Sequence, residues 1–274
     1  MGIEVGRFRR HNAGVLIESP QNPTIKRLKE LREVKGRRVQ GRFLIDGPRE
    51  AERALQKNIG MVAAYVCREF PVDENLIKEF SIRGMEIVDV GKRAFETICY
   101  RENPVGILVE AKTWNTDLTD LKLKKPTFVV IAEDIEKPGN LGTLLRSCDA
   151  AGVEALIGCD ATVDLFNANT LRASASAAFS VPYATASRGE ALAWAKRNGV
   201  KIIATSPDAE KTLWEIDLKE PVAIAIGSEA WGLTPEFLAA ADETVALPML
   251  GLGDSLNVSV ATGIMLYEAL RQRR

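Results

Sequence analysis

Histidine is almost absent from this chain of 274 residues, which has one, His11, in a basic N-terminal stretch. A single histidine excludes a Ser-His-Asp triad, an H-E-x-x-H helix and a histidine-based metal centre. The four cysteines are scattered and form no C-x-x-C pair, so we expect neither a disulfide framework nor a zinc knuckle. We predict that all four cysteines are buried and behave as small hydrophobic residues, at Cys67, Cys99, Cys148 and Cys159. Catalysis must then use other side chains or a cofactor, and we expect no metal.

Long apolar runs are also missing. No stretch approaches the roughly 20 apolar residues that span a bilayer. The first ten residues are already charged and no apolar segment follows them, so we expect no signal peptide. Hydrophobic residues make up 46% of the chain, which is enough for a packed core. The sequence therefore predicts a folded cytoplasmic protein without a membrane partner.

The standard phosphate-binding loops do not occur. The chain has no G-x-x-x-x-G-K-[ST] motif, and Gly251-Leu-Gly253 lacks the third glycine of G-x-G-x-x-G. This disfavours a nucleotide kinase or an ordinary dinucleotide-binding enzyme.

What the sequence does contain is an uneven charge. The formal net charge is −1, but residues 1–57 carry 14 Lys or Arg against 7 Asp or Glu, so the rest of the chain has a net charge of −8. A basic block at one end is typical of a surface that binds phosphates, although a solvated helix face gives the same pattern. The candidate phosphate contacts in this block are Lys26, Arg27, Arg37, Arg38, Arg42 and Arg49.

Strands and helices alternate in the first 118 residues. Thr24 is a plausible cap for a first helix. Gly36 and Gly41 are expected to close this helix, with a basic loop between the two glycines. The pattern predicts further helices at 48–57, 75–80 and 92–98, and strands at 42–47, 61–67, 86–90 and 105–111. We therefore expect a small α/β layer structure, which forms a first domain at 1–118.

A polar and charged segment at 114–125 is the candidate linker to a second domain, at 119–274. Continuous apolar strands of the parallel-sheet kind follow it, at 127–133, 155–158, 201–205, 221–227 and 243–248. Helices are expected between them, at 140–151, 167–175, 190–198 and 235–241, with a long last helix at 257–274. The second domain is therefore also predicted to be α/β, with a parallel sheet.

Three polar segments follow predicted strands of this second domain, where open α/β sheets bind ligands. They are 137–146, 226–233 and 247–261. Each has an ordinary explanation: Asn140 as a capping residue, Glu229 as a favourable acid near a helix start, and Ser255 and Asn257 as caps of the last helix. Taken singly, the ordinary explanation is the better one.

Taken together and in order, the segments resemble the three motifs of the SpoU/TrmH-type RNA ribose 2'-O-methyltransferases of the SPOUT superfamily. The motifs stand here as N-L-G-T-L-L-R at 140–146, G-S-E-A-W-G-L at 227–233, and L-P-M at 247–249 with S-L-N-V-S-V-A at 255–261. Leu247 replaces the more usual isoleucine. The stretch around 42–50, with N-P-T-I-K at 22–26, is similar to the family's ribosomal-protein-like substrate-binding domain.

The resemblance implies a trefoil-knotted catalytic domain, a homodimer, and S-adenosylmethionine as the cofactor. By position, the cofactor would be bound by Thr205, Gly227, Ser228, Leu247, Met249 and Leu256. Arg146 would be the central catalytic residue. Because a charged guanidinium has no acceptor, we expect Arg146 to bind a phosphate and the developing alkoxide rather than act as the base. Asn140, Glu229, Ser255 and Asn257 would orient it, and Arg172 would be a second contact to RNA.

Alternatives to a methyltransferase remain open at this point. A catalytically silent RNA-binding relative would share the fold, but the motif residues are intact. A small-molecule α/β enzyme would not need the basic N-terminus. The substrate implied by the resemblance is RNA, with 23S ribosomal RNA favoured and tRNA as the alternative. The modified nucleotide, and a housekeeping or an antibiotic-resistance role, stay undecided.

Overall fold

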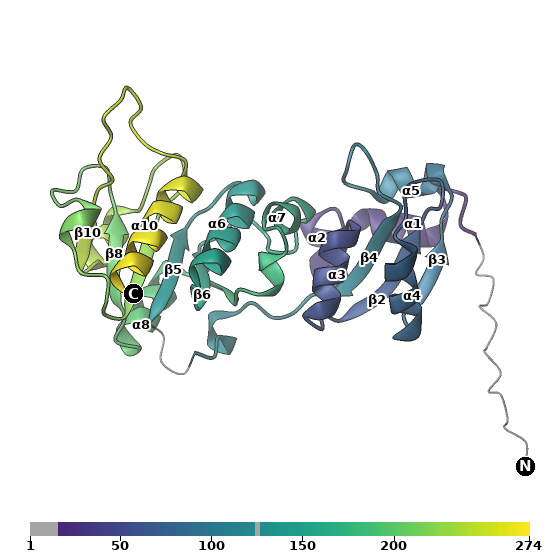
Figure 1. Cartoon of the computed structure of the whole chain (residues 1–274), viewed down its shortest axis with the longest axis horizontal. Helices are drawn as coiled ribbons and strands as arrows, with labels where there is room; N and C mark the ends of the chain where they lie inside the picture. The colour runs from purple at the N-terminus through teal and green to yellow at the C-terminus, as the bar shows by residue number, and fades with distance from the viewer. Residues whose placement is uncertain (1–15, 124–126) are drawn as a thin grey trace, which may run out of the picture.

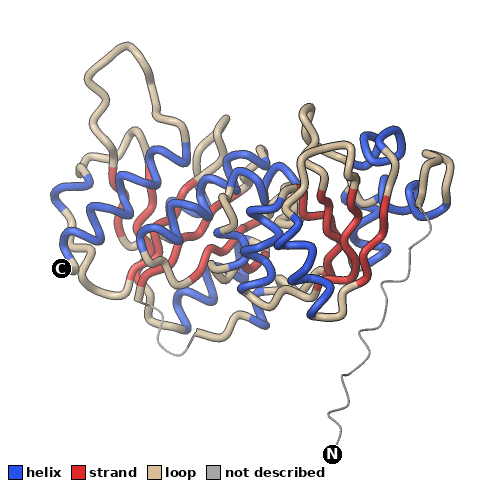
Figure 2. The backbone as a smooth tube through the Cα atoms, turned by 45° about the vertical axis from the view of Figure 1, so that its right-hand side comes forward, coloured by secondary structure: helices blue, strands red, loops and turns tan. Residues whose placement is uncertain are grey.

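The computed structural model describes residues 16–123 and 127–274, and His11 and the first basic residues lie outside them. Two α/β units lie side by side along the long axis of the molecule (Figure 1). Each unit has its own sheet, with helices on both faces (Figure 2). Within the described residues, no helix has the length and apolar character needed to cross a membrane.

The N-terminal unit contains a four-stranded mixed sheet. Its strand order is β1 (Arg42–Asp46), β4 (Ile107–Lys112), β2 (Met61–Val66) and β3 (Glu86–Asp89). Only β2 and β3 are parallel, while β4 runs antiparallel to both of its neighbours.

Helices cover both faces of this sheet because alternate strand residues point to opposite sides. In β1, Leu44 packs with helices α1 (Pro23–Glu30) and α5 (Lys92–Ile98), whereas Phe43 and Ile45 pack with α3 (Pro48–Gln56) and α4 (Glu74–Ile82). The alternating α/β pattern predicted for this region is therefore confirmed.

The basic segment before β1 differs from the prediction. It forms a second helix, α2 (Val34–Gln40), instead of a loop, and α1 is capped by Asn22 rather than Thr24. Gly36 does not end a helix; it lies inside α2, where a Cβ atom would come 2.0 Å from the carbonyl oxygen of Glu30. Its role is to let two helices approach closely. Gly41, in the left-handed region at φ 59°, does end α2.

The C-terminal unit is built on six parallel strands. Their order in the sheet is β10 (Glu243–Val245), β8 (Lys201–Thr205), β9 (Val222–Ile226), β5 (Phe128–Glu133), β6 (Ala155–Cys159) and β7 (Tyr183–Ala186). The parallel sheet was predicted, but β7 was not. It is a short edge strand of mixed burial directly after Pro182, so it lacks the continuous apolar run of the inner strands.

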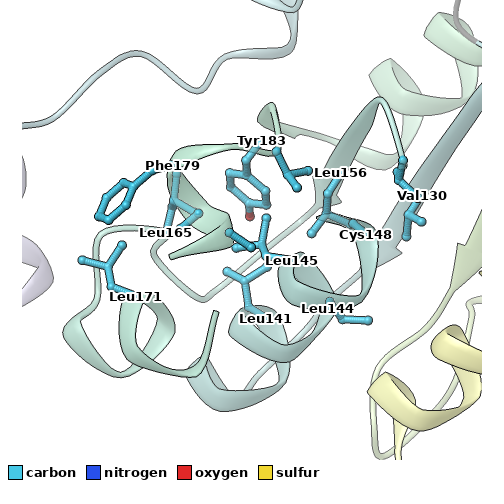
Figure 3. Packing of buried hydrophobic residues seen from close by; sticks show 14 of the residues in the cluster. Val130, Leu141, Leu144, Leu145, Cys148, Leu156, Leu165, Leu171, Phe179 and Tyr183 are labelled. Atoms are coloured by element: carbon cyan, nitrogen blue, oxygen red, sulfur yellow. The ribbon is translucent and has the colours of Figure 1, made fainter. Parts of the chain in front are cut away.

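Two layers of helices cover the parallel sheet. Helices α6 (Pro138–Ala151), α7 (Ala168–Ala173) and α10 (Val258–Gln272) lie on one face, and α8 (Arg188–Arg197) and α9 (Pro235–Ala240) on the other. Short 3-10 turns occur at η1 (Leu118–Asp120), η2 (Ala177–Phe179) and η3 (Leu213–Glu215). Figure 3 shows Leu141, Leu144 and Cys148 of α6 in the core between α6 and the sheet. All four cysteines are buried and free, as predicted.

Arg273, near the end of the described chain, binds the residues that precede two strands of this sheet, at the end of the sheet where the parallel strands begin. Arg273 donates to the carbonyl oxygens of Thr127 at 2.8 Å, Leu218 at 2.7 Å and Glu220 at 2.7 Å. Its guanidinium also stacks over the ring of Phe128. These contacts join the C-terminal helix to the residues that precede β5 and β9.

A buried carboxylate, Glu110, organises the face of the N-terminal sheet that α1 covers. Both oxygens of Glu110 accept from the guanidinium of Arg27, at 2.7 and 2.8 Å, and one also accepts from the hydroxyl of Tyr65 at 3.0 Å. Arg42 lies 3.7 Å away. Burial alone would raise the pKa of Glu110, but the hydrogen bonds and charge of Arg27 outweigh it and hold the pKa below its usual 4.5.

We predict that Glu110→Gln lowers the free energy of unfolding by about 1.5–3 kcal/mol at pH 7, the range for a hydrogen bond to a charged group. A carboxylate whose pKa is lowered by folding stabilises the protein above its unfolded pKa, and the effect is lost as the pH falls through the folded value. The difference between wild type and variant should therefore shrink as the pH falls below the usual 4.5. Urea unfolding at several pH values measures it. Glu79→Gln, which breaks an exposed pair with Arg83, is the control and should change stability by at most about 0.5 kcal/mol.

Candidate active site

The three polar segments identified in the sequence meet at the carboxyl edge of the parallel sheet. Thr205, Gly227 and Leu247 lie at or just beyond the ends of β8, β9 and β10, which are joined in one sheet. Val245 of β10 pairs in register with Thr205 of β8. The segment from β10 to α10 forms a long loop that extends beyond the sheet (Figure 1). Topology therefore brings together segments that are far apart in the sequence.

Hydrogen bonds centred on Asn140 join all three segments. The side-chain amide of Asn140 donates to Glu229, and Asn257 Nδ2 donates to Asn140 Oδ1 at 3.3 Å. Ser259 Oγ donates to the carbonyl oxygen of Asn140 at 3.3 Å, and the amide of Glu136 donates to Glu229 at 3.4 Å. Asn140 is thus a link between motifs and not a cap, since Lys137 holds the cap position of α6.

Asn257 and Ser259 have both a structural and a linking role. Asn257 caps α10 by accepting from the amide of Ser259 at 3.0 Å, as its ordinary explanation expects. Its amide nitrogen is still free to reach Asn140. Ser259 was not singled out from the sequence, although it stands two residues after Asn257 in the third motif. Ser255 is exposed and stays apart from these hydrogen bonds.

The segment with Glu229 is a tight hairpin. Ser228 and Gly232 exchange two backbone hydrogen bonds at 3.0 Å, and Ser228 Oγ accepts from the amide of Trp231 at 3.1 Å. A Cβ atom on Gly227 would lie 1.9 Å from the carbonyl carbon of Gly232. Glycine is therefore required at 227 by the close approach of backbone on the two sides of the turn.

A second polar cluster, which the sequence analysis missed, binds the residues that directly follow this hairpin. Glu133, at the carboxyl end of β5, is 1% exposed. It accepts from the amide of Thr234 at 2.8 Å and from its hydroxyl at 3.0 Å, and it pairs with Arg188. The pKa of Arg188 is raised above its usual value, mainly by its hydrogen bond to Glu133 and, to a smaller extent, by its hydrogen bond to Glu236. Glu133 ends a strand that is otherwise fully apolar, so only its charge could have marked it.

Arg146 lies on the exposed side of α6, about two turns beyond Asn140. Residues 139, 143, 146 and 150 share this exposed stripe, at helical spacing. Within residues 16–123 and 127–274, no hydrogen bond or ion pair joins Arg146 to Asn140, Glu229, Ser255 or Asn257. The contacts expected to orient Arg146 are therefore not made within one described chain.

The residues predicted to bind a cofactor line the same edge. Ser228 and Gly227 are buried, Thr205 and Leu247 are half-buried, and Met249 and Leu256 are each 37% exposed. Between 247 and 256, no backbone amide or carbonyl is engaged by another part of the described chain. Free peptide groups beside leucine and methionine side chains suit a ligand with a polar edge and apolar faces, such as adenine.

The predicted RNA-binding residues differ in their surroundings. Lys26, Arg38, Arg49 and Arg172 are exposed, and Arg172 also bonds Asn169 at 3.0 Å. Arg27 and Arg42 are only partly exposed because they surround Glu110.

The prediction that Arg37 contacts RNA is wrong. Its side chain is 2% exposed and forms an ion pair with Asp164 at 2.6 Å, so it has no surface to offer a phosphate. A run of basic residues does not show which of its members point inward.

Metal ligands are not assembled in the described ranges. Neither 16–123 nor 127–274 holds a group of three or more His, Cys, Asp or Glu side chains placed to bind a metal ion.

A parallel α/β domain with polar loops gathered at one edge of its sheet, preceded by a smaller α/β domain, is the architecture of a two-domain α/β enzyme. Residues 127–267 match the SpoU rRNA Methylase family, and residues 22–109 match the MRM3-like substrate binding domain. The chain belongs to the SpoU rRNA methylase family, as the motifs indicated.

Three similar proteins illustrate the relationship. The 23S rRNA (guanosine(2553)-2'-O)-methyltransferase RlmP of Bacillus subtilis is 31% identical over 92% of this chain and 97% of its own length. The tRNA (guanosine(18)-2'-O)-methyltransferase of Thermus thermophilus is 36% identical over 56% of this chain and 79% of its own. The AdoMet-bound rRNA methyltransferase of Sinorhizobium meliloti superimposes with a TM-score of 0.84 at 30% identity, covering 93% of this chain and 97% of the other.

We predict that Gly227→Ala destabilises the protein by about 1–3 kcal/mol, because the added carbon meets backbone that cannot move without opening the hairpin. Gly251→Ala is the matched control, since nothing lies within 4 Å of a Cβ atom at that position. Thermal unfolding of both variants measures the effect. Equal midpoints for the two would contradict the close approach at 227.

Proposed function

We propose that this chain transfers the methyl group of S-adenosylmethionine to a ribose 2'-hydroxyl of RNA, with 23S ribosomal RNA as the favoured substrate. The hydrogen bonds that Asn140 donates to Glu229 and accepts from Asn257 carry the proposal, because they join the three family motifs at the carboxyl edge of the sheet. The relatives named above support it in their activity and in the cofactor bound. The first domain, at about 1–118, would hold the RNA and the second would carry out the transfer.

The choice of ribosomal RNA follows from how much of the chain is matched. The Bacillus subtilis enzyme named for 23S rRNA is similar over both units, whereas the Thermus thermophilus enzyme named for tRNA matches only 56% of the chain. The N-terminal unit is therefore the part that favours ribosomal RNA, and tRNA remains the second candidate.

The bound cofactor would supply an electrophilic methyl group, so the protein need not provide a nucleophile of its own. The peptide groups of residues 247–256 would bind its adenine edge, with Leu247 and Leu256 against its faces. Thr205, Gly227, Ser228 and Met249 would complete this lining. A charged guanidinium donates and does not accept, so Arg146 would bind a phosphate next to the target ribose and stabilise the developing alkoxide. No metal is needed for these steps.

A second copy of the chain would complete the site. Arg146 and the bonds around Asn140 do not meet within one described chain, which agrees with a site shared by two subunits. Large apolar side chains are exposed nearby, with Trp231 at 87% and Leu250 at 98%, and Val260 and Tyr267 of α10 are also exposed. Contact with a second copy would remove the apolar surface of these side chains from water. The proposal therefore includes a homodimer. It also includes the trefoil knot that the family resemblance implies, and action in the cytoplasm.

Radiolabelled S-adenosylmethionine tests the function directly. We expect wild-type protein to label 23S rRNA from cells that lack it, and to leave tRNA unlabelled. Arg146→Ala should lower the rate by at least about 100-fold, the usual cost of losing a donor to a developing oxyanion, with folding and cofactor affinity unchanged. Arg197→Ala, an exposed arginine at the end of α8, is the control. Label in neither RNA would reject the proposed function, and near-normal turnover of Arg146→Ala would reject its assigned role.

A charge test addresses the RNA surface. Lys26 and Arg38 are exposed on α1 and α2, so replacing both with alanine should weaken RNA binding uniformly across sequences and reduce the salt dependence of the affinity. Cofactor affinity should not change. Lys57→Ala with Lys78→Ala removes the same charge near α3 and α4, which cover the other face of the sheet. If the two double variants lose RNA affinity equally, the basic surface is not the binding surface.

A further inference from the structure

One buried arginine joins the two units. Arg37 belongs to α2 of the N-terminal unit, and its Nη1 donates to the carbonyl oxygens of Leu31 and Arg32, both at 2.8 Å. Its Nε donates to Asp164 Oδ2 at 2.6 Å, and Asp164 belongs to the C-terminal unit, between β6 and α7. Arg37 is therefore held by its own unit in the position from which it reaches the other.

Asp164 is fixed from its own side as well. Its second carboxylate oxygen accepts from the amide of Phe166 at 2.9 Å, and its carbonyl oxygen accepts from the amide of Asn167 at 3.1 Å. These bonds shape the turn that starts α7. Because each partner is also held by hydrogen bonds within its own unit, the ion pair need not immobilise two otherwise free side chains.

Aromatic and backbone contacts surround this pair. Phe166 packs against Phe43 of β1, with ring centroids 5.0 Å apart, and against Trp114, with centroids 4.7 Å apart and rings nearly perpendicular. The carbonyl oxygen of Thr116 accepts from the amide of Thr185 on the edge strand β7 at 2.5 Å. Trp114 also packs against Phe43, with ring centroids 5.9 Å apart, so the start of the expected linker contacts both units and does not act as a free tether.

We propose that Arg37 and Asp164 are positioning residues, which hold the N-terminal unit in one orientation so that RNA bound there is presented to the site at Asn140 and Glu229. The idea rests on the proposed function. A buried charge that loses its partner is strongly unfavourable, so the pair favours one arrangement of the units over others that separate the two charges. Reaction rates depend steeply on placement, because an error of about 1 Å can cost about 100-fold.

Asp164→Asn tests the proposal with little disturbance, since an amide oxygen at this position can still accept from the amide of Phe166. Spin labels at Lys57→Cys in the N-terminal unit and Lys196→Cys in the C-terminal unit report their separation, and the four natural cysteines are buried. The labelled chain is mixed with an excess of unlabelled chain, so that each dimer holds at most one labelled copy. We then expect one narrow distance distribution in the protein that keeps Asp164 and a broad one in the Asp164→Asn variant. Single-turnover methylation of 23S rRNA should fall about tenfold or more in the variant, while RNA and cofactor affinities stay within about twofold.

The control is Glu74→Gln, which removes one charge from an exposed pair with Arg68 and should change neither readout. An unchanged distance distribution in Asp164→Asn, or a broad one with unchanged turnover, would overturn the proposal. If circular dichroism shows that Asp164→Asn does not fold, the double variant Arg37→Gln with Asp164→Asn removes both charges of the pair, leaves no unpaired buried charge and is judged by the same two outcomes. Wild-type protein that methylates no RNA would reject the proposed function, whereas the label distances would still decide if the ion pair fixes the orientation.

Discussion

The structure depends on the hydrogen bonds that meet at Asn140. A parallel sheet gathers the ends of its strands at one edge, but it does not fix the loops that follow them. Asn140 uses its side-chain nitrogen, its side-chain oxygen and its backbone carbonyl to hold Glu229, Asn257 and Ser259. One amide therefore sets the relative position of the start of α6, the hairpin after β9 and the start of α10. Loops that would otherwise move independently become a single surface.

Much of the fold was predictable because it follows from periodicity. Apolar strands such as 127–133 and 221–227 appear where expected, and so do the alternating helices. The misses are those that local patterns cannot resolve. Strand β7 has no continuous apolar run, and α2 contains Gly36, which suggests a helix end until its neighbour Glu30 is seen.

The candidate site shows the same division. Motif spacing identified Asn140, Glu229 and Asn257, and the structure brings them together. Motif spacing could not reveal Glu133, because the partner that explains a carboxylate at the end of an apolar strand is Arg188, 55 residues away. Nor could it separate Arg37 from its neighbours, since Asp164 lies 127 residues further on. Partners at such distances leave no trace in a local pattern.

The charge asymmetry of the sequence also has a more detailed meaning. Part of the positive charge in the first 57 residues is used internally, by Arg37 against Asp164 and by Arg27 and Arg42 around Glu110. Within residues 16–57, the charge offered to solvent is therefore smaller than the count suggests, and Lys26 and Arg38 are among the residues that offer it.

The contacts of Arg273 affect how the protein is made. The parallel sheet begins at β5, but Thr127, just before that strand, is held by an arginine 146 positions later. During synthesis the N-terminal unit can fold as soon as it leaves the ribosome, as domains generally do. The second unit cannot complete its sheet before β10, at 243–245, has emerged, and the bonds of Arg273 form after that. The part that would hold RNA is therefore complete well before the part that would modify it.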